Sequence, residues 1–344
     1  MKKTILTKIN TPWVIIPCSL ALGAAVSFAI TKNQFLKSER ALLDQVRPVH
    51  IQNNKYQYIN PLIGYSIPDV GEFSEFKPLE AKINAYITSA KQNKQATEVS
   101  VYFRDLNLGR WTGINENEQY DPASMLKVVI MIAYYKEAQT NPGILDQKIT
   151  YTKDLSGLIT LVPNQASSTL EVNKQYSIEQ LIEAMIVNSD NGAKNALLAD
   201  LDSNSLNEVF TDLGVQVPPD NSPYTISAKA YTLFFRVLYN STYLNEVYSE
   251  KALELLNQTQ YKDGLVAGLP KGTDISHKFG EHVETDSLGT VTNIELHDCG
   301  IVFHPDKPYV LCVMTRGTDL KALTQTIQGI SKQVYESVDS GYKN

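Results

Sequence analysis

The apolar run Val128–Ala133 is the feature of this sequence that most limits what the chain can fold into. It follows Asp121, a residue type that favours the N-cap of a helix, and Pro122, which fits the first helical position. Because a helix that is apolar on every side must be buried, we expect a helix that begins here and lies inside the core. The 43% hydrophobic content of the chain is enough to build such a core.

Hydrophobic periodicity elsewhere predicts helices and strands in a definite order. Helical spacing covers residues 78–90 and 177–187, and the second segment opens with a capping box of Ser177 and Gln180. A hairpin after the first helix, a helical middle and late strands predict an α+β domain whose sheet is made from both chain ends. The strands are predicted at residues 97–103, 110–113, 276–281, 300–303 and 309–314.

Composition and charge exclude several classes of function. The chain has 344 residues and a formal net charge of -6, so it lacks the excess of basic residues that binding to nucleic acid requires. Its three cysteines, Cys18, Cys299 and Cys312, are too few for a disulfide scaffold and form no CxxC pair. Its five histidines show no HExxH spacing. We therefore expect no metal, no cofactor and no nucleic-acid partner.

The N-terminus departs most from the composition of a soluble protein. Residues 12–30 are uncharged, and basic residues lie on both sides of them. About 20 apolar residues span a bilayer core, and the lysines before the run favour the cytoplasmic side. We predict a cytoplasmic tail, residues 1–10, and a transmembrane helix, residues 11–30, that holds the rest of the chain outside the cytoplasm. Ser27-Phe28-Ala29 also resembles a signal-peptidase site, so secretion after cleavage is the alternative.

The remaining chain divides into a linker and one large domain. Residues 31–75 contain scattered prolines and glycines with little periodicity and are predicted as a juxtamembrane linker. Residues 76–344 are predicted as the folded domain. Within this domain, Cys299 and Cys312 flank a hairpin almost symmetrically and can be neighbours on adjacent strands. Outside the cytoplasm they either form a disulfide or remain packed thiols.

The chemistry begins at the start of the buried helix, where Ser124 and Lys127 are three residues apart. This spacing places both side chains on one face of a helix, so the lysine can reach the serine hydroxyl. A serine becomes a nucleophile when a base takes its proton, and burial among apolar neighbours can lower the pKa of a lysine enough for that task. The plain alternative is a capping serine beside a lysine that extends along the apolar surface.

Two further motifs follow along the chain. Ser189-Asp190-Asn191 comes directly after the helix 177–187 and is predicted as a turn between helices. Lys278-Phe279-Gly280 is predicted to begin a strand before the late apolar runs. An SxxK motif, then SDN about 60 residues later, then a Lys-x-Gly strand is the ordered signature of penicillin-recognising serine enzymes.

On these residues the sequence resembles the class A β-lactamase-like serine hydrolases, a family related to penicillin-binding DD-peptidases. The resemblance runs from about residue 76 to the end of the chain and includes residues 115–117, 189–193 and 263–268. It implies a five-stranded antiparallel sheet flanked by helices and a serine acyl-enzyme mechanism. The implied substrate is a β-lactam or the D-Ala-D-Ala end of a peptidoglycan stem peptide.

The resemblance also implies roles for individual residues. Ser124 is the expected nucleophile, Lys127 is its expected base, and Ser189 is expected to pass a proton to the leaving nitrogen. The oxyanion hole would consist of the backbone N–H groups of Ser124 and Glu281, which depend on position rather than side-chain identity.

Substrate binding is expected at the second and third motifs. Asn191 would hold the side-chain amide of the substrate, and Lys278 would supply positive charge beside Ser189 and the substrate carboxylate. The full set of expected substrate-binding residues is Asn191, Lys278, Phe279, Gly280, Glu281 and Arg316.

Two departures from the family pattern affect the predicted chemistry. The loop 215–225 has no glutamate to activate the deacylating water, and Asp220 is its only acid, which is either that base or a solvated turn residue. Phe279 stands where the family usually has threonine or serine, so a hydroxyl that would bind the substrate carboxylate is missing. Arg316 either replaces that contact or forms a surface salt bridge.

Three functions follow from the resemblance. The first is a membrane-anchored, extracytoplasmic acyl hydrolase of the β-lactamase and DD-peptidase type with slow deacylation. The second is a true β-lactamase with a different deacylation base, and the third is a cell-wall or β-lactam sensor that is acylated without turnover. A Ser-His-Asp triad that uses His277 or His297 is also conceivable, although Lys127 makes it unnecessary.

Overall fold

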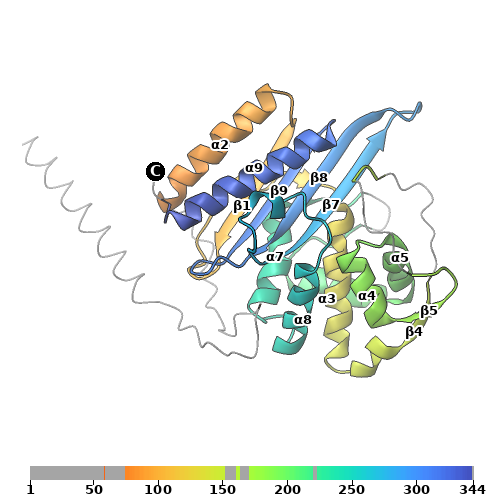
Figure 1. Ribbon diagram of the computed structural model, residues 1–344. Coiled ribbons are helices and arrows are strands. Elements are labelled where there is room, and N and C mark those ends of the chain that lie inside the picture. The colour runs from red at the N-terminus through yellow and green to blue at the C-terminus, as the bar shows by residue number, and fades with distance from the viewer. Residues whose placement is uncertain (1–57, 59–73, 152–159, 163–169, 220–222, 343–344) are drawn as a thin grey trace, which may run out of the picture. The chain divides into compact units, whose positions relative to one another are not determined.

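A five-stranded antiparallel sheet is the centre of the fold (Figure 1). The computed structural model describes residues 58, 74–151, 160–162, 170–219 and 223–342. The strand order is β2-β1-β9-β8-β7, so strands from both ends of the folded chain lie side by side. This order confirms the predicted α+β class and a sheet that is made from both chain ends. The strands are β1 (Glu98–Asp105), β2 (Trp111–Ile114), β7 (Ile275–Thr285), β8 (Val291–Val302) and β9 (Tyr309–Gly317).

Helices cover both faces of this sheet (Figure 1). Helices α2 (Lys77–Gln92) and α9 (Leu320–Asp339) pack on one face, and α7 and α8 contact the other. The helices on that other side are α3 (Lys127–Ala138), α4 (Ile178–Val187), α5 (Asn191–Asp200), α6 (Ser203–Asp212), α7 (Ala228–Tyr239) and α8 (Glu246–Asn257).

Short elements connect these layers. Two small ribbons pair β3 (Gln119–Tyr120) with β6 (Ile226–Ser227), and β4 (Lys148–Thr150) with β5 (Gln175–Ser177). The single-turn helices are η1 (Ser74–Phe76), η2 (Ala123–Leu126), η3 (Pro142–Asp146) and η4 (Val266–Gly268).

Strand alternation separates the core into two clusters. On β8, Ile294, Leu296 and Val302 belong to the cluster shared with α2 and α9, whereas Cys299 and Ile301 belong to the cluster around α3. Successive side chains of a strand point to opposite faces, so the sheet contributes to both clusters. Neighbouring residues along β7 and β8 therefore pack into different clusters.

Helix α3 is the buried helix that the sequence predicts, but it begins later than expected. Every residue of Val128–Tyr135 is buried. The expectation that Asp121 caps the helix is wrong, because η2 precedes α3 and Ala123 has a φ of +47°. A residue in the left-handed region cannot continue a regular α-helix, so Asp121 instead accepts a hydrogen bond from the Ala123 N–H at 2.7 Å.

The other local predictions are confirmed at the level of elements. The helix at residues 78–90 is α2, and the helix at 177–187 is α4. In the capping box of α4, the Gln180 N–H donates to Ser177 Oγ at 3.2 Å and the Ser177 N–H donates to Gln180 Oε1 at 3.0 Å. The predicted Lys-x-Gly strand is β7, which begins at Ile275.

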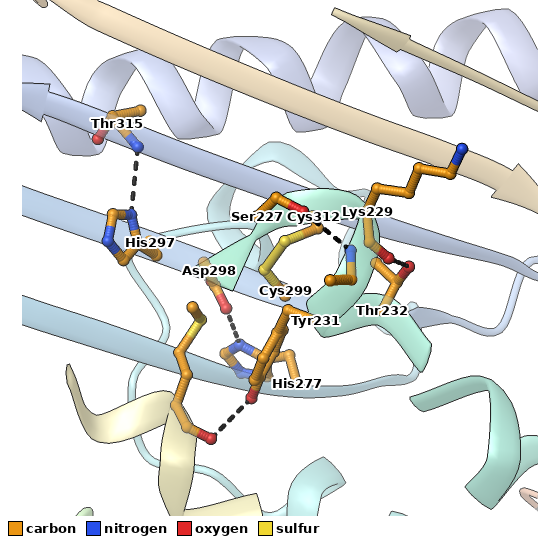
Figure 2. The surroundings of a disulfide bond; sticks show 12 residues. Ser227, Lys229, Tyr231, Thr232, His277, His297, Asp298, Cys299, Cys312 and Thr315 are labelled. Atoms are coloured by element: carbon orange, nitrogen blue, oxygen red, sulfur yellow. Dashed lines mark hydrogen bonds and ion pairs between the residues drawn. A yellow bond between two sulfur atoms is a disulfide. The ribbon is translucent and has the colours of Figure 1, made fainter. Parts of the chain in front are cut away.

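Cys299 and Cys312 form a disulfide (Figure 2). They are directly opposite residues of β8 and β9, and their Cα atoms are 4.0 Å apart. Both lie in the cluster around α3. Of the two states that the sequence left open, the structure contains the disulfide.

The predicted anchor, residues 11–30, and almost all of the predicted linker lie outside the described residues. From the linker, the structure describes Tyr58 and also Ser74 and Glu75, which belong to η1. The Tyr58 N–H donates to the Glu250 carboxylate at 2.8 Å, and the Tyr58 ring centroid is 5.2 Å from that of Phe303. Among the described helices, none has both the length and the apolar character that a membrane span requires. The described elements all belong to the unit of residues 49–344.

Candidate active site

Ser124 and Lys127 lie in contact where η2 runs into α3. Lys127 Nζ is 2.9 Å from Ser124 Oγ, which is hydrogen-bond distance. The lysine side chain has no exposed surface, because it is the first residue of the buried helix. The three-residue spacing seen in the sequence therefore brings these two groups together, as predicted.

The surroundings of Lys127 favour its neutral form. Burial lowers the pKa of its amine well below the ordinary value, and the nearby charges of Lys278 and Lys194 lower it further. Asp190 acts in the opposite direction and is outweighed. A neutral amine at hydrogen-bond distance from a hydroxyl is able to accept the hydroxyl proton.

Ser189 links this pair to a second buried lysine. Its hydroxyl Oγ is 3.1 Å from Lys127 Nζ and 2.9 Å from Lys278 Nζ, and its carbonyl oxygen accepts from Lys127 at 2.6 Å. Ser189 adopts a left-handed backbone with φ of +56° in the turn between α4 and α5. The result is a continuous chain of polar groups from Ser124 through Lys127 and Ser189 to Lys278.

Lys278 is also fully buried. Burial lowers the pKa of its amine to about 7, although the negative charge of Asp298 opposes this effect. Lys278 is therefore able to exchange a proton near neutral pH, and the pKa of Lys127 is lowered in the same direction by its own burial.

The second motif is held in place by its aspartate. The Asp190 carboxylate caps α5 by accepting from the Ala193 N–H at 2.8 Å, and it accepts a further bond from Tyr151 Oη at 3.1 Å. A Cβ at Gly192 would lie 2.6 Å from that same hydroxyl, so only glycine fits beside Tyr151. Asn191 is the first residue of α5 and is half-buried. Nothing in the sequence indicated that Tyr151 donates a hydrogen bond to Asp190.

Strand β8 fixes the turn that carries Ser124. The Asp121 N–H donates to Glu295 Oε2 at 2.8 Å, and His297 Nε2 lies 3.0 Å from the Asp121 carbonyl oxygen. His297 Nδ1 accepts from the Thr315 N–H at 3.3 Å (Figure 2), which leaves the ring proton on Nε2 to be donated to Asp121. His297 is thus engaged with the main chain, not with a serine.

Glu295 is a charged group under this turn. Burial opposes its ionisation, but the neighbouring His297 ring and the hydrogen bonds from Arg316 and the Asp121 N–H outweigh burial and lower the pKa of the carboxyl group to about 2. Its contacts with Asp121, His297 and Arg316 were not predicted from the sequence, because their partners are far apart along the chain.

Gly280 brings the edge of β7 against the same turn. A Cβ at this position would lie 2.5 Å from the Pro122 carbonyl oxygen and 2.9 Å from Met125 Cγ. A side chain would therefore force the strand away from η2. The absence of a side chain allows β7 to pack against η2, the turn that carries Ser124.

The side chain of Phe279 is buried at the edge of the site. It is 2% exposed, and its ring stacks on that of Tyr261 with centroids 4.2 Å apart. The Lys278 amine lies 4.4 Å from the centroid of the Phe279 ring. At residue 279, where the sequence predicts a missing hydroxyl, the structure therefore has the stacked rings of Phe279 and Tyr261.

Arg316 is held by protein groups. Its Nε donates to Glu295 at 2.7 Å, and its terminal nitrogens donate to Glu118 at 3.4 Å and to the Gln119 carbonyl at 3.0 Å. Of the two roles that the sequence left open for Arg316, the structure contains the ion pair.

The remaining candidates lie apart from this arrangement. His277 Nδ1 is 2.8 Å from Asp298 Oδ1, and both side chains are fully buried (Figure 2). This pairing does not include a serine, so the Ser-His-Asp alternative has no support at His277. Asp220 lies outside the described residues. In the part of the chain that the structure describes, no cluster of three or more His, Cys, Asp or Glu could hold a metal ion.

The chain matches a family model and a curated protein. Residues 78–338 match a model described as the beta-lactamase enzyme family. A beta-lactamase of Streptomyces albus G is 26% identical over 248 residues, which cover 67% of this chain and 76% of that protein.

Solved structures share the fold. A mutant of PBP-A, an acyl-enzyme complex with penicillin G, is 22% identical with a TM-score of 0.62, covering 76% of this chain and 97% of that one. A class A beta-lactamase from Mycobacterium abscessus is 21% identical with a TM-score of 0.60, covering 75% of this chain and 99% of that one. These likenesses establish a common α+β architecture.

Proposed function

Because the chain belongs to the beta-lactamase enzyme family, we propose that this serine hydrolase forms an acyl-enzyme at Ser124 with β-lactams or with peptides that end in D-Ala-D-Ala. The observation that carries the proposal is the buried pair in which Lys127 Nζ lies 2.9 Å from Ser124 Oγ. A serine beside a neutral amine has the activation that nucleophilic attack on a carbonyl requires.

We propose that acylation uses the whole series of hydrogen-bonded side chains from Ser124 to Lys278. Lys127 takes the proton of Ser124 as Oγ attacks the carbonyl carbon, and the backbone N–H groups of Ser124 and Glu281 stabilise the oxyanion. Ser189, whose Oγ is within 3.1 Å of both lysine amines, returns a proton to the leaving nitrogen as the C–N bond breaks. The position of Gly280 against the Ser124 turn supports this use of the β7 main chain.

Substrate contacts are proposed on both sides of Ser124. Asn191, at the first position of α5, binds the amide of the acyl side chain. Lys278 stabilises the hydrogen-bond network at Ser189 rather than contacting solvent, because its side chain is fully buried.

Deacylation is proposed to be slow. Residues 215–219 and 223–225, the described parts of the loop expected to carry the base, contain no glutamate. General-base assistance is typically worth 10²–10⁴-fold in rate, so an acyl-enzyme without it is long-lived. PBP-A, which shares the fold, has been solved in a mutant form as an acyl-enzyme with penicillin G.

We also propose that the domain works outside the cytoplasm on an N-terminal anchor. The uncharged run at residues 12–30 and the Cys299–Cys312 disulfide support this location, because disulfides persist in oxidising compartments. Protease added to intact cells with a permeable envelope should digest the domain. Full protection of the domain would contradict the proposed topology.

A labelling and turnover experiment tests the function. Full-length protein incubated with a fluorescent penicillin should carry the label, and Ser124→Ala should abolish it, whereas Ser89→Ala on the exposed face of α2 should not. Release of D-Ala from a D-Ala-D-Ala peptide would select peptidase activity, and rapid β-lactam hydrolysis would select a β-lactamase with another deacylation base. Labelling without turnover of either compound would select a sensor, and an unlabelled protein would contradict the proposal.

A further inference from the structure

Helix α5 has a lysine on the same face as Asn191. The buried face of this helix consists of Gly192, Ala193, Ala196 and Leu197. Asn191 and Lys194 are half-buried and belong to the other face. Because residues three apart are neighbours on the surface of a helix, Lys194 lies next to Asn191, one turn further along α5.

The charge of Lys194 acts on the reactive pair. It lowers the pKa of Lys127, whose Nζ is 2.9 Å from Ser124 Oγ. Helix α5, which carries Lys194, contacts α3, which begins at Lys127. Because the interaction between two charges weakens with distance, the Lys194 amine lies on the side of α5 that faces the reactive pair.

The Lys194 amine has no acid to neutralise it in the described parts of the chain, where it forms neither an ion pair nor a hydrogen bond. The acid nearest in sequence, Asp190, is already engaged. Its carboxylate accepts from the Ala193 N–H at 2.8 Å and from Tyr151 Oη at 3.1 Å. Burial lowers the pKa of the Lys194 amine, as expected for a cation that lacks a counter-ion. An anion from a ligand would supply the missing partner.

The proposed binding mode decides which part of a substrate meets this amine. Asn191 is proposed to bind the amide of the acyl side chain. The group beyond that amide is then closest to the next half-buried turn of α5, which carries Lys194. An ammonium group donates hydrogen bonds and accepts none, so its complement is a carboxylate in that part of the substrate.

We propose that Lys194 is a specificity-determining residue that binds a carboxylate on the acyl side chain of the substrate. This inference rests on the proposed acyl-enzyme function and adds a substrate class to it. For a peptide, the residue joined to the D-Ala that is transferred to Ser124 carries the free carboxyl group. The terminal carboxylate of D-Ala-D-Ala belongs to the leaving group and has no part in this contact.

The test compares benzylpenicillin with carbenicillin, its derivative with one added carboxylate on the acyl side chain. Acylation of Ser124 in the full-length protein is followed by intact mass, and the rate constant for carbenicillin is divided by that for benzylpenicillin. This ratio should be about fivefold or more higher in the wild type than in Lys194→Met, because hydrogen bonds to charged groups contribute at least that factor. Lys194→Arg, which keeps the charge, should retain most of the wild-type ratio.

Two controls separate a local contact from a general effect of charge. Lys321→Met removes an exposed lysine of α9, on the other face of the sheet, and should leave the ratio at the wild-type value. Raising the ionic strength from about 0.05 M to about 0.5 M screens charges, so it should lower the ratio in the wild type. The ratio in Lys194→Met should not fall with salt.

A ratio that is equal in the wild type and in Lys194→Met would overturn the inference. This includes the case in which Lys194→Met slows both penicillins to the same extent, because that loss would come from a raised pKa of Lys127. Acylation of the wild type by benzylpenicillin would then leave the proposed function intact. Failure of both penicillins to acylate Ser124 would overturn the proposed function and the inference together.

Discussion

Two lysines buried on either side of Ser189 define the chemistry of this protein at the residue scale. A buried ammonium ion is costly unless it is paired or loses its proton. Lys127 and Lys278 both have lowered pKa values, and the first cause in each case is burial. These buried amines are therefore the groups that we propose as proton acceptors and donors around Ser124.

The pKa of Lys278 links this chemistry to stability. It is about 7 in the folded protein against 10.5 for an ordinary lysine. Between these pH values the unfolded chain binds more protons, so the contribution of Lys278 to the free energy of unfolding rises with pH. Relative to Lys278→Met, the wild type should gain about 1 kcal/mol per pH unit between pH 7 and pH 9.

Urea unfolding at the two pH values measures this gain. Lys321→Met, which removes an exposed lysine of α9, is the control and should show a difference from wild type that does not change with pH. A Lys278→Met difference that is equally flat would mean that Lys278 keeps its proton in the folded protein.

Replacing Ser189 should slow acylation most for substrates whose leaving group needs a proton. Ser189→Ala removes the hydroxyl that lies 2.9 Å from Lys278 Nζ and 3.1 Å from Lys127 Nζ. Acylation by a β-lactam should fall about 10²–10⁴-fold, whereas acylation by a thioester, whose thiolate leaves without protonation, should fall much less. Stopped-flow rates for both compounds check this. Equal losses would assign Ser189 to activation of Ser124 instead.

Phe279 should limit the reaction of anionic β-lactams. Phe279→Thr introduces a hydroxyl donor, and a hydrogen bond to a charged group contributes about 1.5–3 kcal/mol, so acylation by a penicillin should rise about tenfold or more. The lost stack on Tyr261 should cost about 3 kcal/mol of stability. An unchanged or lower rate in a folded variant, checked by circular dichroism, would mean that another group already binds the carboxylate.

At the scale of elements, the site depends on the contact between β7 and η2. Gly280→Ala would place a Cβ 2.5 Å from the Pro122 carbonyl oxygen. The strand must then move, so we expect a loss of about 1–3 kcal/mol in stability and a fall of at least tenfold in acylation rate. Thermal unfolding and labelling by a fluorescent penicillin measure the two effects.

Gly143→Ala is the matched control, because a Cβ there meets nothing closer than 3.8 Å. It should leave both stability and labelling close to the wild-type values. A Gly280→Ala protein that labels at the wild-type rate would show that β7 does not position the reaction.

Local features of the site were predictable from the sequence, and contacts between distant segments were not. Ser124 and Lys127 meet because a helical turn brings residues three apart together, and the capping box of α4 is equally local. The bond from the Asp121 N–H to Glu295 and the bond from His297 to the Asp121 carbonyl join residues 174 and 176 positions apart, so they depend on how β8 packs. The late start of α3 was missed because a positive φ at an alanine, Ala123, has no sequence signal.

At the scale of the whole molecule, the sheet brings strands from both ends of the folded chain next to the turn that carries Ser124. β8 holds the Ser124 turn through Asp121, β7 presents the edge at Gly280, and the helical part supplies Lys127 and Ser189. The groups that we propose for acylation therefore come from both parts of the fold. The described loop residues provide no glutamate for deacylation.

We propose above that β-lactams acylate Ser124 and are released slowly. Intact-mass spectrometry of the full-length protein, sampled over time after mixing with a penicillin, tests it most directly. We predict an adduct of the mass of the whole penicillin that persists for minutes or longer, maps to the peptide containing Ser124 and is absent in Ser124→Ala. Rapid hydrolysis of the penicillin with no adduct at any time would contradict slow release, and no reaction at all would contradict acylation.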